Sequence, residues 1–278
     1  MDAKVDYLSF TLPLNLGGVG HGENVEREIA SKMLFYGLDT LVDILAMSKA
    51  PTRNNGRKWY GCGVHWKDNN VSIWWGGVAN HTLIELSGVS CQMLRDGEAM
   101  MPTIKAMNER TTRVDLAVDF PDGVTPADFV ASKKQNRFKV TQTNDEDTGL
   151  TQYVGSRKSD RYSRVYRFNE PHPRAGVLRV EHVLRGRYSK ILSTGLISTS
   201  IAEQVAILGN TFGWTHESWQ PETVTDGKLR AKRHDKDDAS TLRWLIKAVA
   251  PSLAKSHNSG LIDLHDFIDR HVMPLVDE

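Results

Sequence analysis

Cysteine is scarce in this sequence. Cys62 and Cys91 are its only two cysteines, and they do not form a CxxC pair. Free thiols in a reducing cytoplasm are the expected state of such a pair. No apolar run approaches the ~18 residues that a membrane-spanning helix requires, and the charged start MDAKVDYLSF lacks the apolar core of a signal peptide. We therefore expect a cytoplasmic protein with no membrane partner.

Two further patterns are missing. The loop after the first predicted strand contains Gly17, Gly18, Gly20 and Gly22, but it lacks the GxxxxGK[ST] pattern of a phosphate-binding loop. The sequence shows no internal repeat and no low-complexity tract. What it has is an ordinary globular composition, with 278 residues of which 40% are hydrophobic and 25% charged. This size and composition favour one large domain, or a domain with a smaller appendage.

Alternating polar and apolar residues predict three strands between Arg113 and Lys190. The segments are RVDLAVDF, YVGSRKSDRYSRVYRFN and LRVEHVLRG. If they are neighbours in one sheet, carboxylates, arginines and a tyrosine share one of its surfaces. The carboxylates would repel one another, so we expect them to pair with arginine or to hold a divalent cation. The residues of this surface are Arg113, Asp115, Asp119, Arg164, Tyr166, Arg179, Glu181 and Arg185.

Positive charge is concentrated in one segment of a nearly neutral chain. The whole sequence has a formal net charge of +1, whereas residues 153–190 contain 10 Lys+Arg and 3 Asp+Glu and so carry +7. A basic segment beside an acidic strand favours an anionic partner, and phosphate together with a metal ion matches both signs of charge. A solvated charged face is the plainer alternative.

The sequence resembles the replication initiation factor family at several short motifs in the same order. The main motif is YVGSRKSDRYSRVYRF followed by LRVEHVLRG, and VDYLSFT, SIWWGG, LIELSGVSC and RVDLAVDF also match, so that the resemblance covers residues 4 to 195. This family comprises rolling-circle initiators of small plasmids, with relatives in filamentous phages and among the relaxases of integrative elements. The resemblance implies a protein of a phage or mobile element that acts in the cytoplasm of a bacterial host.

The resemblance also implies an activity, namely nicking of single-stranded or hairpin DNA at a replication origin. In this family a tyrosine hydroxyl attacks a phosphodiester and leaves a 5′-phosphotyrosine and a free 3′-OH, while a divalent metal polarises the phosphate. None of the ten histidines forms the His-hydrophobic-His pair of the other large class of nicking enzymes. The expected cofactor is therefore Mg²⁺ or Mn²⁺ held by carboxylates. A host helicase or polymerase and a second copy of the chain are further expected partners.

The family's nucleophile has four candidates here, which are Tyr153, Tyr162, Tyr166 and Tyr188. Tyr166 lies in SRVYRF, which matches an Arg-x-Tyr motif of the family. Alternation places it beside Arg164, which could hold the phosphate or lower the phenol pKa. The family carries a lysine two places after this tyrosine, where this chain has Phe168. We predict that Tyr166 and Arg164 are catalytic; a half-buried structural tyrosine is the alternative.

The remaining charged residues of this region have predicted roles as well. We expect Asp115, Asp119 and Glu181 to bind the metal, and the alternative is that they only pair with neighbouring arginines. The predicted contacts to DNA phosphates are Arg157, Lys158, Arg161, Arg179 and Arg185.

The order of predicted elements indicates an α+β fold. We expect an antiparallel or mixed β-sheet core with helices packed on one face, followed by a small C-terminal helical unit. One predicted helix, Glu23 to Met47, contains Gly37 near its middle. The expected domains are 1–195, the catalytic domain, and 196–278, the helical region. Two alternatives to a nicking enzyme stay open: a non-catalytic protein that binds an origin or hairpin, and a metal-dependent nuclease without a covalent step.

Overall fold

A computed structural model describes most of the chain, namely residues 2–14, 16, 23–57, 59–120, 125–126, 129–131, 138–145, 149–169, 174–215, 250–261 and 263–271. The chain divides into two compact units, Met1–Ala231 and Lys232–Glu278. The predicted boundary between residues 195 and 196 falls inside a helix of the first unit and stays a prediction.

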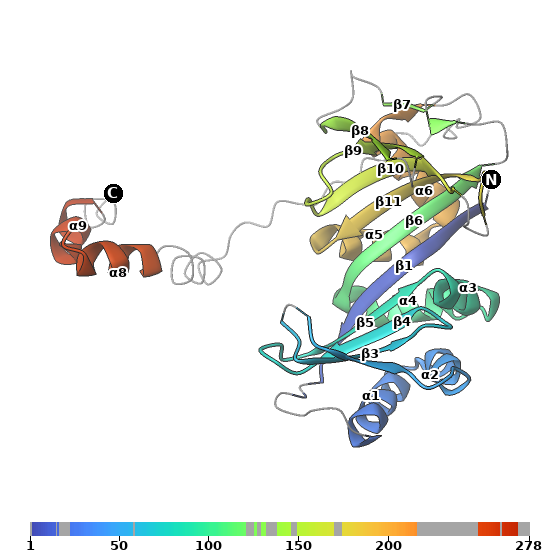
Figure 1. Ribbon diagram of the computed structural model, residues 1–278, viewed down its shortest axis with the longest axis horizontal. Coiled ribbons are helices and arrows are strands. Elements are labelled where there is room, and N and C mark those ends of the chain that lie inside the picture. The colour runs from blue at the N-terminus through green and yellow to red at the C-terminus, as the bar shows by residue number, and fades with distance from the viewer. Residues whose placement is uncertain are drawn as a thin grey trace. The chain divides into compact units, whose positions relative to one another are not determined.

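The first unit is built on a ten-stranded antiparallel sheet (Figure 1). Its strand order is β2-β3-β4-β5-β1-β6-β11-β10-β9-β8, with β1 and β6 side by side at the centre. Two short strands, β7 (Val130–Ala131) and β12 (Trp214–Thr215), pair separately. The strands of the large sheet are β1 (Asp2–Leu12), β2 (Thr52–Asn55), β3 (Cys62–Trp66), β4 (Val71–Trp75), β5 (Thr82–Ser87), β6 (Thr111–Phe120), β8 (Val140–Asp145), β9 (Gly149–Val154), β10 (Arg161–Arg167) and β11 (Leu178–Arg185).

Alternation along the strands gives the sheet one apolar face, which the helices cover. Val114, Leu116 and Val118 of β6 are fully buried, and α5 (Arg187–Ser198) and α6 (Ile201–Phe212) pack over this part of the sheet. Burying each such side chain contributes about 1.5 to 3 kcal/mol. The residues between them on β6 point to the opposite face, which therefore carries the charged side chains.

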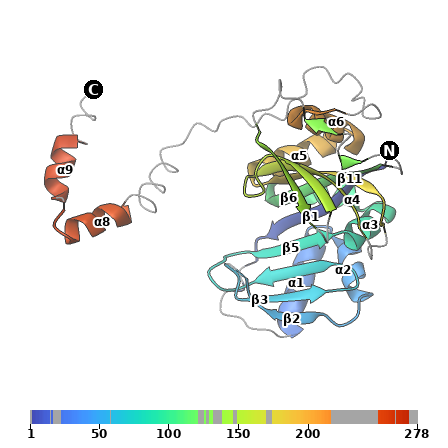
Figure 2. The same cartoon turned by 45° about the horizontal axis from the view of Figure 1, so that its top comes forward.

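Helices cover the apolar face of the N-terminal strands as well. In Figure 2, α1 (Glu23–Phe35) lies behind β2 and β3, and side chains of α1, α2 (Asp39–Ala46), β3 and β4 line one apolar pocket. The chain breaks the predicted long helix at Gly37, whose φ of 69° is left-handed and suits glycine at a helix end. Between β5 and β6 lie α3 (Val89–Asp96), α4 (Met100–Met107) and the short helix η1 (Asn108–Arg110).

The second unit contains α8 (Ala250–Asn258) and α9 (Leu264–His271). The predicted fold class is confirmed: the protein is α+β, and its large sheet is antiparallel with packed helices. In the parts of the chain that the structure describes, no helix is both long and apolar enough to cross a bilayer.

Candidate active site

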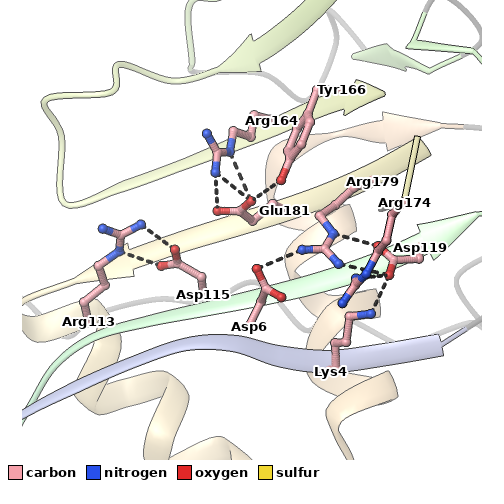
Figure 3. A network of polar contacts seen from close by, with 10 residues as sticks. All are labelled: Lys4, Asp6, Arg113, Asp115, Asp119, Arg164, Tyr166, Arg174, Arg179 and Glu181. Carbon is pink, nitrogen blue, oxygen red and sulfur yellow. Dashed lines mark hydrogen bonds and ion pairs between the residues drawn. The ribbon is translucent and has the colours of Figure 1, made fainter. Parts of the chain in front are cut away.

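The face of the sheet opposite the helices α5 and α6 carries a network of charged side chains (Figure 3). Its members come from the central strands β1 and β6, from β10 and β11 beside them, and from the segment before β11. They form three groups, each centred on a carboxylate: Glu181 with Arg164 and Tyr166, Asp115 with Arg113, and Asp119 with Lys4, Arg174 and Arg179, which also contacts Asp6.

Glu181 is the acceptor of the first group. Its carboxylate is buried and receives hydrogen bonds from Arg164 Nε at 3.1 Å and from Nη2 at 2.8 and 2.9 Å. The Tyr166 hydroxyl donates to Oε2 of the same carboxylate at 3.0 Å. The register explains the group, because Arg164 lies directly opposite Glu181 and Tyr166 lies two residues further along β10 on the same face. The sequence prediction that Tyr166 and Arg164 lie together is thus met by their positions.

Burial governs the acidity of the Tyr166 phenol. Removal from water raises its pKa, Glu181 raises it further, and Arg164 and Arg179 lower it by less. Arg164 therefore lowers the phenol pKa, as the sequence suggested, but the net shift of this pKa is upward. The phenol is protonated at neutral pH, and its hydrogen bond is directed at a carboxylate that could take the proton when the oxygen attacks.

Asp119 is surrounded by cations. Arg179 donates to it from Nε at 2.6 Å and from Nη2 at 3.0 Å, Arg174 donates from Nη1 at 3.0 Å, and Lys4 also pairs with it. Burial alone would raise the pKa of Asp119, but the hydrogen bonds from Arg179 and Lys4 outweigh it and lower the pKa. Arg179 pairs on its other side with Asp6, at 2.8 Å. Arg179, which was predicted to contact DNA phosphate, is therefore buried and paired with two carboxylates.

Asp115 is held by Arg113 alone among the cations of the network, with hydrogen bonds of 2.8 and 2.5 Å. Burial, and to a lesser extent the nearby Glu181, raise the pKa of Asp115 to about 7 against the hydrogen bonds from Arg113. Arg113 also lies over the Tyr7 ring, at 4.1 Å from its centroid. This pair continues the network toward the N-terminal strands.

The three predicted metal ligands do not form one site as they are arranged. Asp115, Asp119 and Glu181 belong to three different ion-pair groups, and the described residues contain no group of three or more acidic, His or Cys side chains suited to a metal. A divalent ion bound by these carboxylates would have to displace the cations that now pair with Asp115, Asp119 or Glu181. Binding of Mg²⁺ or Mn²⁺ at these carboxylates accordingly stays a prediction.

The other predicted phosphate contacts gather around the turn between β9 and β10. Arg157 and Lys158 are exposed there, and Arg185 donates to the Arg157 carbonyl at 2.9 Å. Arg157 and Arg185 lie over the rings of Tyr153 and Tyr162, each at 5.5 Å. Arg161 differs from these residues, because it lies over the rings of Phe138 and Tyr188 and faces α5.

The four candidate tyrosines have different surroundings in the structure. Tyr153 and Tyr162 are buried and pack with Val183. Tyr188 lies on α5, and its hydroxyl accepts a hydrogen bond from the neighbouring Arg187 at 3.2 Å. Among the four, Tyr166 has the hydroxyl that donates to a buried carboxylate.

Lys4, Asp6 and Arg174 belong to the network although the sequence did not indicate them. Asp6 lies where the pairing of β1 and β6 shifts register, between Val5 and Tyr7. Such a bulge changes which side chains meet across the strands and is not visible in alternation. The available signal was the run of charges Asp2, Lys4 and Asp6 on alternate residues at the start of the strand.

No family model matches the sequence, and no curated protein matches it either. The fold does have a match among solved structures. It is similar to the structure of the rolling circle replication initiator protein from Geobacillus stearothermophilus, with a TM-score of 0.50 and 18% sequence identity over 81% of this chain and 90% of that one. At this identity the likeness concerns the fold.

Proposed function

We propose that this protein is a replication initiator that nicks single-stranded or hairpin DNA at an origin of a phage or mobile element. One observation carries the proposal: the Tyr166 hydroxyl donates to Glu181, and Arg164 lies at 4.8 Å over the same ring and binds the same carboxylate. The fold, which is that of a rolling circle replication initiator, supports it. The expected site of action is the cytoplasm of a bacterial host.

The proposed step is an in-line displacement at phosphorus. The Tyr166 oxygen attacks a phosphodiester, and its proton passes to Glu181. The bond from phosphorus to the 3′ oxygen breaks, so the 5′ side becomes a phosphotyrosine, and the leaving oxygen takes a proton from water to become a free 3′-OH. Arg164 stabilises the charge that develops on the phosphate oxygens. The free 3′-OH is the end that a host polymerase would extend, with a helicase opening the duplex.

Phe168 stands where the family pattern has a lysine, and an arginine side chain lies against its ring. The Arg179 guanidinium lies over the Phe168 ring, at 4.8 Å from its centroid, and the Tyr166 ring meets Phe168 edge to face at 5.2 Å. A cation is therefore held beside Tyr166 from the neighbouring strand.

The dense pairing of every carboxylate in the network favours the second candidate function, an origin- or hairpin-binding protein that does not cut.

A capture assay separates the candidate functions. Hairpin and single-stranded oligonucleotides labelled at both ends are incubated with the protein and Mg²⁺ or Mn²⁺, then separated under denaturing conditions. We expect the label at the 3′ end of the oligonucleotide to migrate with the protein, because that fragment is joined to tyrosine through its 5′ phosphate. The label at the 5′ end should be released on the fragment that carries the free 3′-OH. Cleavage without capture would indicate a plain nuclease, and binding without cleavage would indicate the non-catalytic protein.

A further inference from the structure

The large sheet consists of two halves with the same strand order. In the N-terminal half, β1 pairs with β5, and β4, β3 and β2 follow toward one edge. In the C-terminal half, β6 pairs with β11, and β10, β9 and β8 follow toward the other edge. Both central pairings are antiparallel, and so is the pairing of β1 with β6 that joins the halves. A half-turn about an axis through the centre of the sheet therefore exchanges the two halves.

The register locates this axis and makes two glutamates equivalent. Tyr7 of β1 pairs with Asp115 of β6. Two residues further along each strand lie Ser9, which pairs with Glu85 of β5, and Ala117, which pairs with Glu181 of β11. A half-turn through the Tyr7 and Asp115 pair thus brings Glu85 onto Glu181.

The side chains around the two glutamates repeat as well. Counting two residues from the partner of each glutamate on the next strand leads to Trp74 on β4 and to Tyr166 on β10. Trp74 Nε1 donates to Glu85 at 2.7 Å, as the Tyr166 hydroxyl does to Glu181 at 3.0 Å.

An arginine completes each group. Arg57 binds Glu85 at 2.5 Å and lies 4.7 Å over the Trp74 ring, whereas Arg164 binds Glu181 at 2.8 Å and lies 4.8 Å over the Tyr166 ring. The two groups differ in the aromatic residue. The indole of Trp74 has no oxygen with which to attack phosphorus, so the residue equivalent to Tyr166 cannot act as a nucleophile here. The Tyr7 hydroxyl also donates to Glu85, at 2.5 Å, and the Arg113 guanidinium lies over its ring.

The surroundings of the N-terminal group fit a single-stranded nucleic acid. The Arg57 side chain is 46% exposed and can contact a phosphate. Trp59 nearby is 68% exposed, and its carbonyl accepts hydrogen bonds from the backbone of Val78 and Ala79, each at 3.1 Å. An exposed indole on an anchored backbone is suited to stacking with an unpaired base, and a neighbouring arginine adds to such binding.

We propose that Arg57 and Trp59 form a second nucleotide-binding site, which holds a single-stranded DNA segment without cutting it. Buried Trp74, together with Glu85, holds the Arg57 guanidinium in place. The inference rests on the proposed function in one respect, because the strand bound here is taken to be the strand presented to Tyr166. Three strand spacings of ~4.8 Å and four residue steps of ~3.4 Å separate Glu85 from Glu181, so the two groups lie about 20 Å apart along the sheet. A strand several nucleotides long would contact both groups.

The test measures the binding of labelled oligothymidylates of graded length, from about 4 to about 20 nucleotides, by fluorescence anisotropy without divalent metal. For the wild type we expect a steep gain in affinity at the length that reaches both groups. Arg57→Gln and Trp59→Ala should each lower the affinity for the long oligomers by about tenfold. The affinity for the shortest oligomers should not change. Arg53→Gln is the matched control, because this substitution removes the same charge from strand β2 nearby. Arg53 pairs there with Glu26 at 3.7 Å.

The outcomes distinguish this inference from the proposed nicking. If both variants bind long oligomers like the wild type, the second site is wrong, whether or not the protein cuts DNA. If the gain is lost in both variants but the wild type forms no covalent adduct, the second site stands and nicking is wrong. Trp59 is exposed, so Trp59→Ala tests the site even if Arg57→Gln unfolds the protein.

Discussion

Glu181 contacts both residues that were predicted to be catalytic, Arg164 and Tyr166. It is 2% exposed, so its charge depends on Arg164 for compensation, and it accepts the hydrogen bond of the candidate nucleophile. A buried carboxylate in this position is better placed to take a proton from Tyr166 than to bind a metal, because its oxygens already have donors. The sequence predicted Glu181 as a metal ligand, and both this role and its place in an active site stay predictions.

Glu181→Gln tests the role of proton acceptor. Glutamine keeps an oxygen for the Tyr166 hydroxyl but cannot accept its proton, so we expect cleavage to slow by about 100-fold or more while DNA affinity is retained. The measurement is the single-turnover rate of adduct formation. Glu28→Gln, at an exposed position of α1, is the matched control. Equal rates for Glu181→Gln and the wild type would remove Glu181 from the mechanism.

Asp115 gives the protein a stability that depends on pH. Its pKa is raised from 3.8 to about 7, first by burial. A carboxyl whose pKa is raised by folding stabilises the folded state fully below its unfolded pKa, and this contribution is lost as the pH rises toward the folded pKa. We therefore expect Asp115→Asn to flatten the decrease in the free energy of unfolding between about pH 4 and pH 7. Urea unfolding across this range checks it, with Asp43→Asn as an exposed control; parallel curves for Asp115→Asn and the wild type would contradict it.

Strands were easier to predict from the sequence than the order in which they pair, although residues 153–169, predicted as one strand, form the end of β9, a turn and β10. RVDLAVDF alternates cleanly and forms β6, whereas β2 consists of Thr52-Arg53-Asn54-Asn55, which has no apolar residue to alternate. Alternation assigns each side chain to a face but does not say which strand lies beside which. The ion pairs of Asp119 with Lys4 and Arg174 depend on that order and on the bulge in β1, so no local pattern could show them.

The N-terminus of α6 carries a capping box that can be tested directly. Ser200 Oγ accepts a hydrogen bond from the Glu203 backbone at 3.2 Å, and the Glu203 carboxylate accepts one from the Ser200 backbone at 2.8 Å. Ser200→Ala should lower the free energy of unfolding by about 1 kcal/mol. Thermal or urea unfolding measures this, and Ser198→Ala, at the end of α5, is a control with an expected effect close to zero. Equal losses in both variants would contradict the capping role.

Taken as a whole, the large sheet has one apolar face and one face that carries charged side chains. The apolar face packs against helices, while the other face holds both arginine–glutamate–aromatic groups and the basic turn between β9 and β10. The sequence showed no repeat because the two halves share strand order and register but few residue identities. Their likeness appears only when pairing is known, which is why it escaped the sequence analysis.

The charge distribution predicts how DNA binding depends on salt. Arg157 and Lys158 are exposed beside the candidate site, and each phosphate contact contributes about 0.7 to the slope of log affinity against log salt for single strands. We expect the double variant Arg157→Gln/Lys158→Gln to reduce this slope by ~1 to 1.5. Lys105→Gln, an exposed residue of α4, should leave it unchanged. An unaltered slope in the double variant would exclude this turn from the DNA interface.

The central claim is that the Tyr166 oxygen attacks DNA, and peptide mass spectrometry of the covalent adduct tests it most directly. The wild type, Tyr166→Phe and Tyr162→Phe are each incubated with labelled hairpin DNA and Mn²⁺, digested, and searched for a peptide that carries a nucleotide. Tyr166→Phe removes one hydroxyl and keeps the packing against Phe168, so the variant should stay folded and bind DNA. We predict a nucleotide on the peptide containing Tyr166 in the wild type and in Tyr162→Phe, and none in Tyr166→Phe. An adduct on Tyr153, Tyr162 or Tyr188, or an adduct that persists in Tyr166→Phe, would contradict it.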